Sequence, residues 1–184
     1  GGCGLAMTPV DLSAIRFRRP IEADHGPIVR VVDEWWGGRR MSGLFLRLWF
    51  QHFTGTSWIA EDEDGRLLGF IIGYISPDDP EVAYAHMIAT DPNRRRHGLG
   101  AALYRQFFGD VAGRGVRRVN AITWPGNRVS VAFHRSIGFA LVDGPGTQLL
   151  YGSPAYADYD GDGEDRVVFV RELDSGHGGA AGRP

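Results

Sequence analysis

The residues best suited to chemistry form a run of arginines that leads directly into glycines. This run extends from Arg94 to Gly100 and reads RRRHGLG. Glycines allow backbone N–H groups to turn toward a ligand, and a helix that begins there adds unpaired N–H groups and the positive end of its dipole. Arginines bind phosphate oxygens through charge-assisted hydrogen bonds. The run predicts a loop that holds a phosphate-bearing ligand; the alternative is a surface arginine cluster beside an ordinary helix start.

The segments on either side of this loop predict a strand before it and a helix after it. Val82 to Thr90 is apolar and has strand character, and every fourth residue from Leu99 to Val111 is apolar, as on one buried helix face. A strand from Val116 to Thr123 and a short helix from Arg128 to Ile137 follow, with Gly138 as a natural helix end. The order from Val82 onward is therefore strand, helix, strand, helix.

The remaining segments complete a mixed α/β pattern, which predicts a sheet with helices on both faces. A helix is expected after Pro20 and a very apolar second helix from Leu44 to Phe53. The segment from Gly144 to Gly163 is expected to be rich in loops. The other predicted strands are Ile15–Arg19, Ser57–Glu61, Leu67–Ile75, Phe139–Val142 and Arg166–Leu173.

Length and composition limit the kinds of protein that this chain can be. Its 184 residues, 43% hydrophobic and 23% charged, predict one globular domain over 12–174, a flexible leader over 1–11 and a flexible tail over 175–184. A net charge of -2 gives no global attraction for nucleic acid. The chain contains no lysine, which excludes Schiff-base chemistry on a lysine, and Cys3 is its only thiol.

Neither a membrane segment nor a metal site is expected. No run of 18 apolar residues and no secretory signal are present, so we expect a cytoplasmic protein without membrane contact. The stretch from Asp158 to Gly163 superficially resembles a calcium loop, but Phe169 stands where such a loop needs its last glutamate. No set of His and Cys residues has zinc spacing.

Two blocks of residues resemble the GCN5-related N-acetyltransferase (GNAT) superfamily. The first block, Arg95 to Gly100, fits the pattern Q/R-x-x-G-x-G/A, and Asp91-Pro92 stands where the family ends a strand with V-x-P. The second block fits N-x-x-[AS]-x-x-[LF]-[YH]-x-x-x-G-F. It consists of Asn127, Ser130, Phe133, His134, Gly138 and Phe139. One short glycine motif is weak, whereas two blocks in order are a specific signal.

The resemblance implies both a fold and a donor. The fold is a central, mostly antiparallel sheet with a splayed parallel pair and helices on both faces. The front half, with its Trp-Trp-Gly-Gly stretch, resembles an uncharacterised bacterial subgroup. The implied co-substrate is acetyl-CoA, with its pyrophosphate on the loop and its pantetheine beside the strand that ends at Thr90. The residues implied to bind it are Ile88, Ala89, Thr90, Arg95, Arg96, His97, Gly98, Leu99, Gly100, Ala101, Asn127, Ser130 and Phe133.

Acetyl transfer to an amine needs a neutral amine, stabilisation of the thioester oxygen and a proton for the leaving thiolate. The resemblance places oxyanion donors at the backbone N–H groups near Met87 and Ile88. His134 stands where the family often has a tyrosine acid, and His86 where it often has a glutamate base. Each histidine has a purely structural alternative. Glu34 is a second candidate base, or one residue of a solvated helix face.

The acceptor side of the predicted reaction is less specific. Trp35 and Trp36 precede a pair of glycines in the front half of the chain, and Arg39 follows it. The resemblance implies that this part of the chain lies over the acceptor site. Aromatic residues at helical spacing are also the ordinary content of a core. The sequence therefore leaves open whether these residues bind the acceptor.

The predicted function is an acetyl-CoA-dependent N-acetyltransferase that acts by direct attack in a ternary complex. Its acceptor would be a small-molecule or protein amine. An acyl-CoA-binding regulatory module without turnover is one alternative, supported by the missing tyrosine and glutamate. A nucleic-acid binder that uses Arg94 to Arg96 is another, and the acidic balance disfavours it. Homodimers are common in the family, but the sequence does not indicate the oligomeric state.

Overall fold

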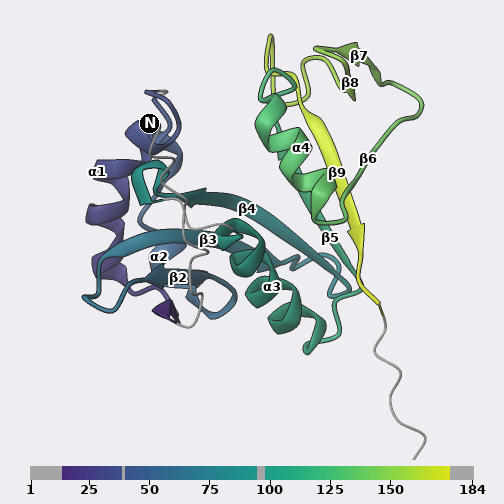
Figure 1. Cartoon of the computed structure of the whole chain (residues 1–184). Helices are drawn as coiled ribbons and strands as arrows, with labels where there is room; N and C mark the ends of the chain where they lie inside the picture. Colours follow the sequence, from purple (N-terminus) through teal and green to yellow (C-terminus); the bar gives the residue numbers. More distant parts are fainter. Residues whose placement is uncertain (1–13, 39, 95–97, 175–184) are drawn as a thin grey trace, which may run out of the picture. The chain divides into compact units, whose positions relative to one another are not determined.

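The computed structural model describes residues 14–38, 40–94 and 98–174. As far as it is described, the chain forms two compact units. The first contains the described residues of 14–74 and 87–107, and the second contains those of 75–86 and 108–174. The boundaries fall inside β3 (Leu67–Ile75), β4 (Val82–Thr90) and α3 (Leu99–Ala112), so each of these three elements contributes residues to both units (Figure 1).

Seven strands form one sheet in the order β1-β2-β3-β4-β5-β9-β6 (Figure 1). Neighbours pair antiparallel except for β4 and β5, which are parallel. Two further short strands, β7 and β8, form a separate hairpin. The bounds are β1 Arg16–Arg18, β2 Trp58–Glu61, β3 Leu67–Ile75, β5 Arg118–Thr123, β6 Ala140–Leu141, β7 Gln148–Leu150, β8 Ser153–Ala155 and β9 Val167–Glu172.

The core of the first unit is built around α1 (His25–Trp35). Ile28 and Val32, one helical turn apart, are fully buried and pack in one cluster with Phe45, Phe50 and Phe70. This spacing is why the segment folds as a helix with one apolar face. The cluster also includes Ala89 near the end of β4, so packing of the front half fixes that strand end.

The predicted second helix is much shorter than the expected range from Leu44 to Phe53. The structure has a 3-10 turn at Ser42–Leu44 and a single-turn helix, α2, at Trp49–His52. Asp33 holds the preceding turn, because its Oδ1 accepts hydrogen bonds from the backbone N–H groups of Met41 (2.6 Å) and Ser42 (2.7 Å). Leu44, Leu46 and Leu48 are exposed, so apolar composition here does not mark a buried helix face.

The second unit is organised around β5, which pairs with β9 over six residues from Arg118↔Glu172 to Thr123↔Val167. Its helix α4 (Arg128–Ser136) turns Val131 and His134 into the unit's core. The β7–β8 hairpin lies in the segment predicted to be loop-rich. Within the described residues, no helix is long and apolar enough to span a membrane.

Candidate active site

The predicted phosphate loop connects β4 to α3. After β4 the chain makes a 3-10 turn at Pro92–Arg94, and Gly98 then has a φ of 81°, in the left-handed region that favours glycine. The helix begins at Leu99, and the N–H of Ala102 donates to the oxygen of Gly98 (2.9 Å). The predicted ligands Arg95, Arg96 and His97 lie outside the described residues. The part described has the glycine conformation and the helix start that an anion-binding loop requires.

The entry to this loop is anchored by its own backbone. The N–H of Asp91 donates to the oxygen of Leu68 on β3 (2.8 Å), and the carboxylate of Asp91 accepts the N–H of Asn93 (2.9 Å). These bonds extend the contact between β3 and β4 past the end of the strand. The loop therefore leaves the sheet from a fixed point.

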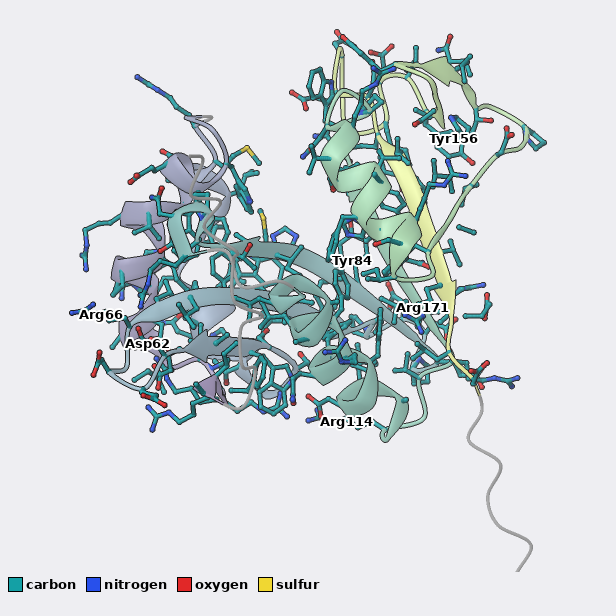
Figure 2. All side chains as sticks on the ribbon, viewed as in Figure 1. Asp62, Arg66, Tyr84, Arg114, Tyr156 and Arg171 are labelled. Carbon is teal, nitrogen blue, oxygen red and sulfur yellow. The ribbon has the colours of Figure 1, made fainter. Side chains whose placement is uncertain are left out.

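Arg94, the first arginine of the loop, is engaged within the protein. Its guanidinium forms an ion pair with Asp62, on the turn between β2 and β3 beside Arg66 (Figure 2). The same carboxylate accepts the N–H groups of Asp64 and Arg66, both at 2.9 Å. The hydrogen bond from Arg66 and the nearby Arg94 lower the pKa of Asp62. Arg94 thus attaches the loop to the turn between β2 and β3. Its positive charge is balanced by Asp62, so it adds little to the charge that the loop offers to a ligand.

The end of β4 carries three of the residues predicted to bind the donor. Ala89 is buried, whereas Ile88 and Thr90 are half-buried. A Cβ atom at Gly69 on β3 would lie 2.8 Å from the oxygen of Ala89 and 3.2 Å from the Thr90 side chain. Glycine at this position therefore allows β3 and β4 to approach closely.

His86 is the last residue of β4 that belongs to the second unit. Its side chain is mostly buried, and burial lowers its pKa from 6.5 to about 4. The imidazole is therefore neutral near pH 7. A neutral imidazole has a nitrogen that can accept a proton, although a conjugate acid with this pKa makes it a weak base.

The second sequence block forms the start of α4. The side-chain oxygen of Asn127 accepts the N–H of Ser130 at 3.1 Å, so these two predicted donor-binding residues form the helix N-cap. Phe133 is half-buried and lies edge-on to His134, with ring centroids 5.3 Å apart. The motif thus has a structural role in its own helix, which does not exclude contact with a ligand.

His134 is buried, with 5% of its surface exposed. Its ring stacks on Phe169 of β9 at 4.6 Å and 11°. Its Nδ1 lies 2.8 Å from the backbone oxygen of Ser130, and because a carbonyl oxygen can only accept, this bond places the proton on Nδ1. Burial lowers the pKa of His134, although the bond to Ser130 opposes the shift. A neutral ring with Nε2 as its acceptor atom favours the structural alternative over the acid.

The candidates for acceptor binding lie in the first unit, and most of them pack against its core. Trp35 stacks on Phe70 at 6.3 Å, and Trp36 contacts Phe45 at 5.6 Å. Glu34 is exposed on α1, as a solvated face would be. Arg39 lies outside the described residues. Both tryptophans are half-buried, so each retains some surface that a ligand can contact.

Two further features had no signal in the sequence. Asn120 on β5 is paired in register with Tyr84 on β4, and no predicted site residue is adjacent to it in the chain. An open pocket of about 390 Å³ lies on the exposed side of α4, between Arg128, Arg135 and the hairpin residues 151–153. None of the predicted site residues lines this pocket.

Comparison with known proteins identifies the family to which these features belong. The model of the "Acetyltransferase (GNAT) family" matches residues 28–139. An L-2,4-diaminobutyric acid acetyltransferase of Nocardia farcinica is 36% identical over 90 residues, which cover 49% of this chain and 46% of the relative. The corresponding protein of Streptomyces coelicolor is 30% identical over 117 residues, 63% of this chain and 69% of the relative. This chain therefore spans less than half of the first relative.

Solved structures share the fold. A GNAT-family protein from Desulfovibrio desulfuricans, described as a putative acetyltransferase, has a TM-score of 0.71 and 22% identity, covering 88% of this chain and all of the other. The diaminobutyrate acetyltransferase EctA of Paenibacillus lautus, solved with its substrate and coenzyme A, has a TM-score of 0.61 and 24% identity, covering 85% and 93%. The fold predicted from the two sequence blocks is confirmed. The family model covers more than half of the chain, and the chain belongs to the acetyltransferase (GNAT) family.

Proposed function

We propose that this chain is an N-acetyltransferase that transfers the acetyl group of acetyl-CoA to an amine, by direct attack in a ternary complex. The observation that carries the proposal is the left-handed Gly98 directly before the 14-residue helix α3, within the segment that matches the family. A loop of this geometry supplies N–H groups and a positive dipole end to phosphate oxygens.

The donor would occupy the loop and the end of β4. The N–H groups of Gly98 to Ala101 would hold its pyrophosphate, and its pantetheine would lie beside Ile88, Ala89 and Thr90. The backbone N–H groups near Met87 are the candidates to stabilise the thioester oxygen. A structural neighbour, the phosphinothricin acetyltransferase of Sinorhizobium meliloti, was solved in complex with acetyl-CoA, which supports the choice of donor.

The acceptor that we propose is a small primary amine, and L-2,4-diaminobutyrate is the first compound to test. Support comes from the names of the relatives in Nocardia and Streptomyces and from the Paenibacillus structure. Half-buried Trp35 and Trp36 fit a compact acceptor with an aliphatic part. A protein amine is the alternative acceptor.

Proton transfer in this proposal relies little on the two histidines as charged groups. Burial keeps His86 and His134 neutral at pH 7. A site that disfavours an imidazolium also disfavours an ammonium, so the amine would enter or react in its neutral form. His86 would orient that amine and accept a proton during attack, with water carrying it away. His134 would position α4, and solvent would protonate the thiolate.

A thiol-release assay with acetyl-CoA and a panel of amines tests the proposal. The panel should contain L-2,4-diaminobutyrate, ornithine, a small monoamine and a peptide with a free N-terminus. Turnover with one class of amine, together with acetylated product by mass spectrometry, is the expected result. Tight coenzyme A binding without turnover on any amine would instead support the regulatory module, which the neutral His134 and the missing tyrosine favour.

Three coarser expectations belong to the same proposal. We expect a single domain over residues 12–174 and a cytoplasmic protein, and the oligomeric state, with a homodimer as the candidate, is left to measurement. Limited proteolysis, cell fractionation and sedimentation velocity, respectively, would check them.

A further inference from the structure

The two faces of the parallel pair β4–β5 differ in character. Side chains alternate between the faces of a strand, and paired residues share a face. One face consists of small or apolar residues that are all buried: Ala83, Ala85, Val119 and Ala121. The other face consists of half-buried residues, most of them polar: Tyr84, His86, Asn120 and Ile122. We call this second set the polar strip.

Both helical segments of the second unit pack on the apolar face. Phe169 of β9 is in register with Ala121, and it is the ring on which His134 of α4 stacks. Phe108, in the last part of α3, contacts Phe139, which contacts Phe169 in turn. In the described part of this unit, the helices therefore leave the polar strip as the less covered face of the sheet.

Asn120 carries an unsatisfied polar atom on the polar strip. Its Oδ1 is buried and has no hydrogen-bond partner among the described residues. Buried side-chain oxygens are almost always hydrogen-bonded, so a native structure that leaves one unpaired at such a place suggests a missing partner. The partner of a carbonyl oxygen must be a donor. Tyr84 is directly paired with Asn120, and His86 follows two residues later on the same face.

We propose that the polar strip is the floor of the acceptor site and that Oδ1 of Asn120 accepts an N–H bond of the acceptor amine. This inference rests on the proposed function and deepens it, because it selects the class of acceptor. A neutral primary amine has two N–H bonds. One is held by Asn120 while the other remains available to be released. A secondary amine has a single N–H, so it cannot satisfy both requirements.

The proton balance of the step follows from this arrangement. The amine nitrogen forms a bond to the thioester carbon, and the C–S bond of acetyl-CoA breaks. The nitrogen then carries one proton too many, which passes to His86 or to water. The thiolate of coenzyme A takes a proton from solvent. The products are an N-substituted acetamide, still held by Asn120 through its remaining N–H, and free coenzyme A.

The test compares acceptors in three variants. For Asn120→Leu, which removes the acceptor oxygen at similar size, kcat/KM for a primary amine should fall roughly tenfold to hundredfold. For the N-methyl derivative of the same amine, kcat/KM should fall less in this variant. The ratio of kcat/KM for the primary amine to that for its N-methyl derivative should therefore decrease. Asn120→Asp, which keeps an acceptor oxygen, should restore the preference. Arg118→Ala, on the exposed start of the same strand, is the matched control and should leave kcat/KM unchanged.

Acetyl-CoA affinity and the melting temperature of each variant, measured alongside, show that the fold and donor site are intact. If wild-type protein binds acetyl-CoA but acetylates no amine, the proposed function fails and the inference fails with it. If wild-type protein is active and Asn120→Leu retains the wild-type preference for primary amines, only the inference is overturned. Loss of acetyl-CoA binding in Asn120→Leu would also overturn it, since the side chain would then serve the donor.

Discussion

Arg94 and Asp62 form an ion pair that ties the loop after β4 to the turn between β2 and β3. The carboxylate side chain of Asp62 is 8% exposed, and it also accepts two backbone N–H groups of its own turn. Removal of Arg94 would leave the carboxylate of Asp62 poorly solvated and without its counter-charge. The pair therefore connects the stability of the hairpin to the position of the proposed donor loop.

Asp62→Asn removes the ion pair but keeps the turn, because an asparagine oxygen can still accept the two backbone N–H groups. We expect a lower free energy of unfolding and a weaker affinity for acetyl-CoA. Urea denaturation and calorimetric titration measure the two effects. Glu63→Gln, at the exposed neighbouring position, is the control for a change of charge alone. An Asp62→Asn protein with unchanged stability and affinity would show that the pair contributes nothing.

Gly98→Val should damage the loop, because a β-branched residue at a φ of 81° is strained by roughly 1–3 kcal/mol. The loop can relieve this strain only by changing the direction of its N–H groups. Acetyl-CoA affinity should fall at least tenfold, as measured by titration. Gly109→Ala, in the helix α3 that follows the loop, is the contrast. A Cβ atom there meets open space, so helix propensity should make this variant as stable as wild type or up to about 1 kcal/mol more stable. Wild-type affinity in Gly98→Val would remove the loop from the donor site.

His86 should make stability depend on pH between the pKa of its imidazole in the folded protein and that in the unfolded chain. Its folded pKa is about 4, below the ordinary value of 6.5, so the unfolded chain binds more protons in that interval. The stabilisation is complete above pH 6.5 and is lost as the pH falls toward 4, by up to about 3 kcal/mol. Urea denaturation at several pH values measures the slope.

His86→Gln should flatten this slope, because glutamine does not titrate. A part of it should remain, since burial lowers the pKa of His134 in the same direction. An unchanged slope in His86→Gln would mean that its imidazole is protonated as readily in the folded protein as in the unfolded chain.

His134→Phe should retain the stacking on Phe169 and lose the contacts of Nδ1 with the backbone oxygen and the hydroxyl of Ser130. We expect kcat within about threefold of wild type, an unchanged pH–rate profile and a stability loss of about 1 kcal/mol. Ser136→Ala removes another side-chain bond to the backbone of α4 and is the matched control. A fall in kcat of tenfold or more, with a lost limb of the pH profile, would restore His134 to the role of acid.

Much of the fold could be predicted because apolar runs are bounded by strong turn signals. The structure has β3 at Leu67–Ile75 and β4 at Val82–Thr90, the bounds expected from the sequence. The β7–β8 hairpin escaped because its two-residue turn is Tyr151-Gly152, both with positive φ. Such turns are usually recognised by Asn or Asp before the glycine. The prediction of a helix from Leu44 was wrong because composition does not say which apolar side chains face solvent.

The candidate site, like the fold, was predicted from the sequence only in part. Motif spacing predicted the loop, since it is a local pattern of backbone and side chain, whereas the helix cap that Asn127 forms was not predicted from the sequence. The partner of Arg94 and the unpaired oxygen of Asn120 depend on strands that are distant in sequence. The sequence could suggest an acid at His134, but only the bond to Ser130 assigns the position of its proton.

The way in which β4 and α3 are divided between the two compact units has a consequence for folding. Each unit combines separate pieces of the chain, and the chain passes from one to the other three times: within β3, within β4 and within α3. A single cleavage of the backbone therefore cannot release either unit intact. Loss of β4 would deprive both units of a structural element, so we expect them to melt in one cooperative transition, and neither half to be recoverable as an autonomous fragment.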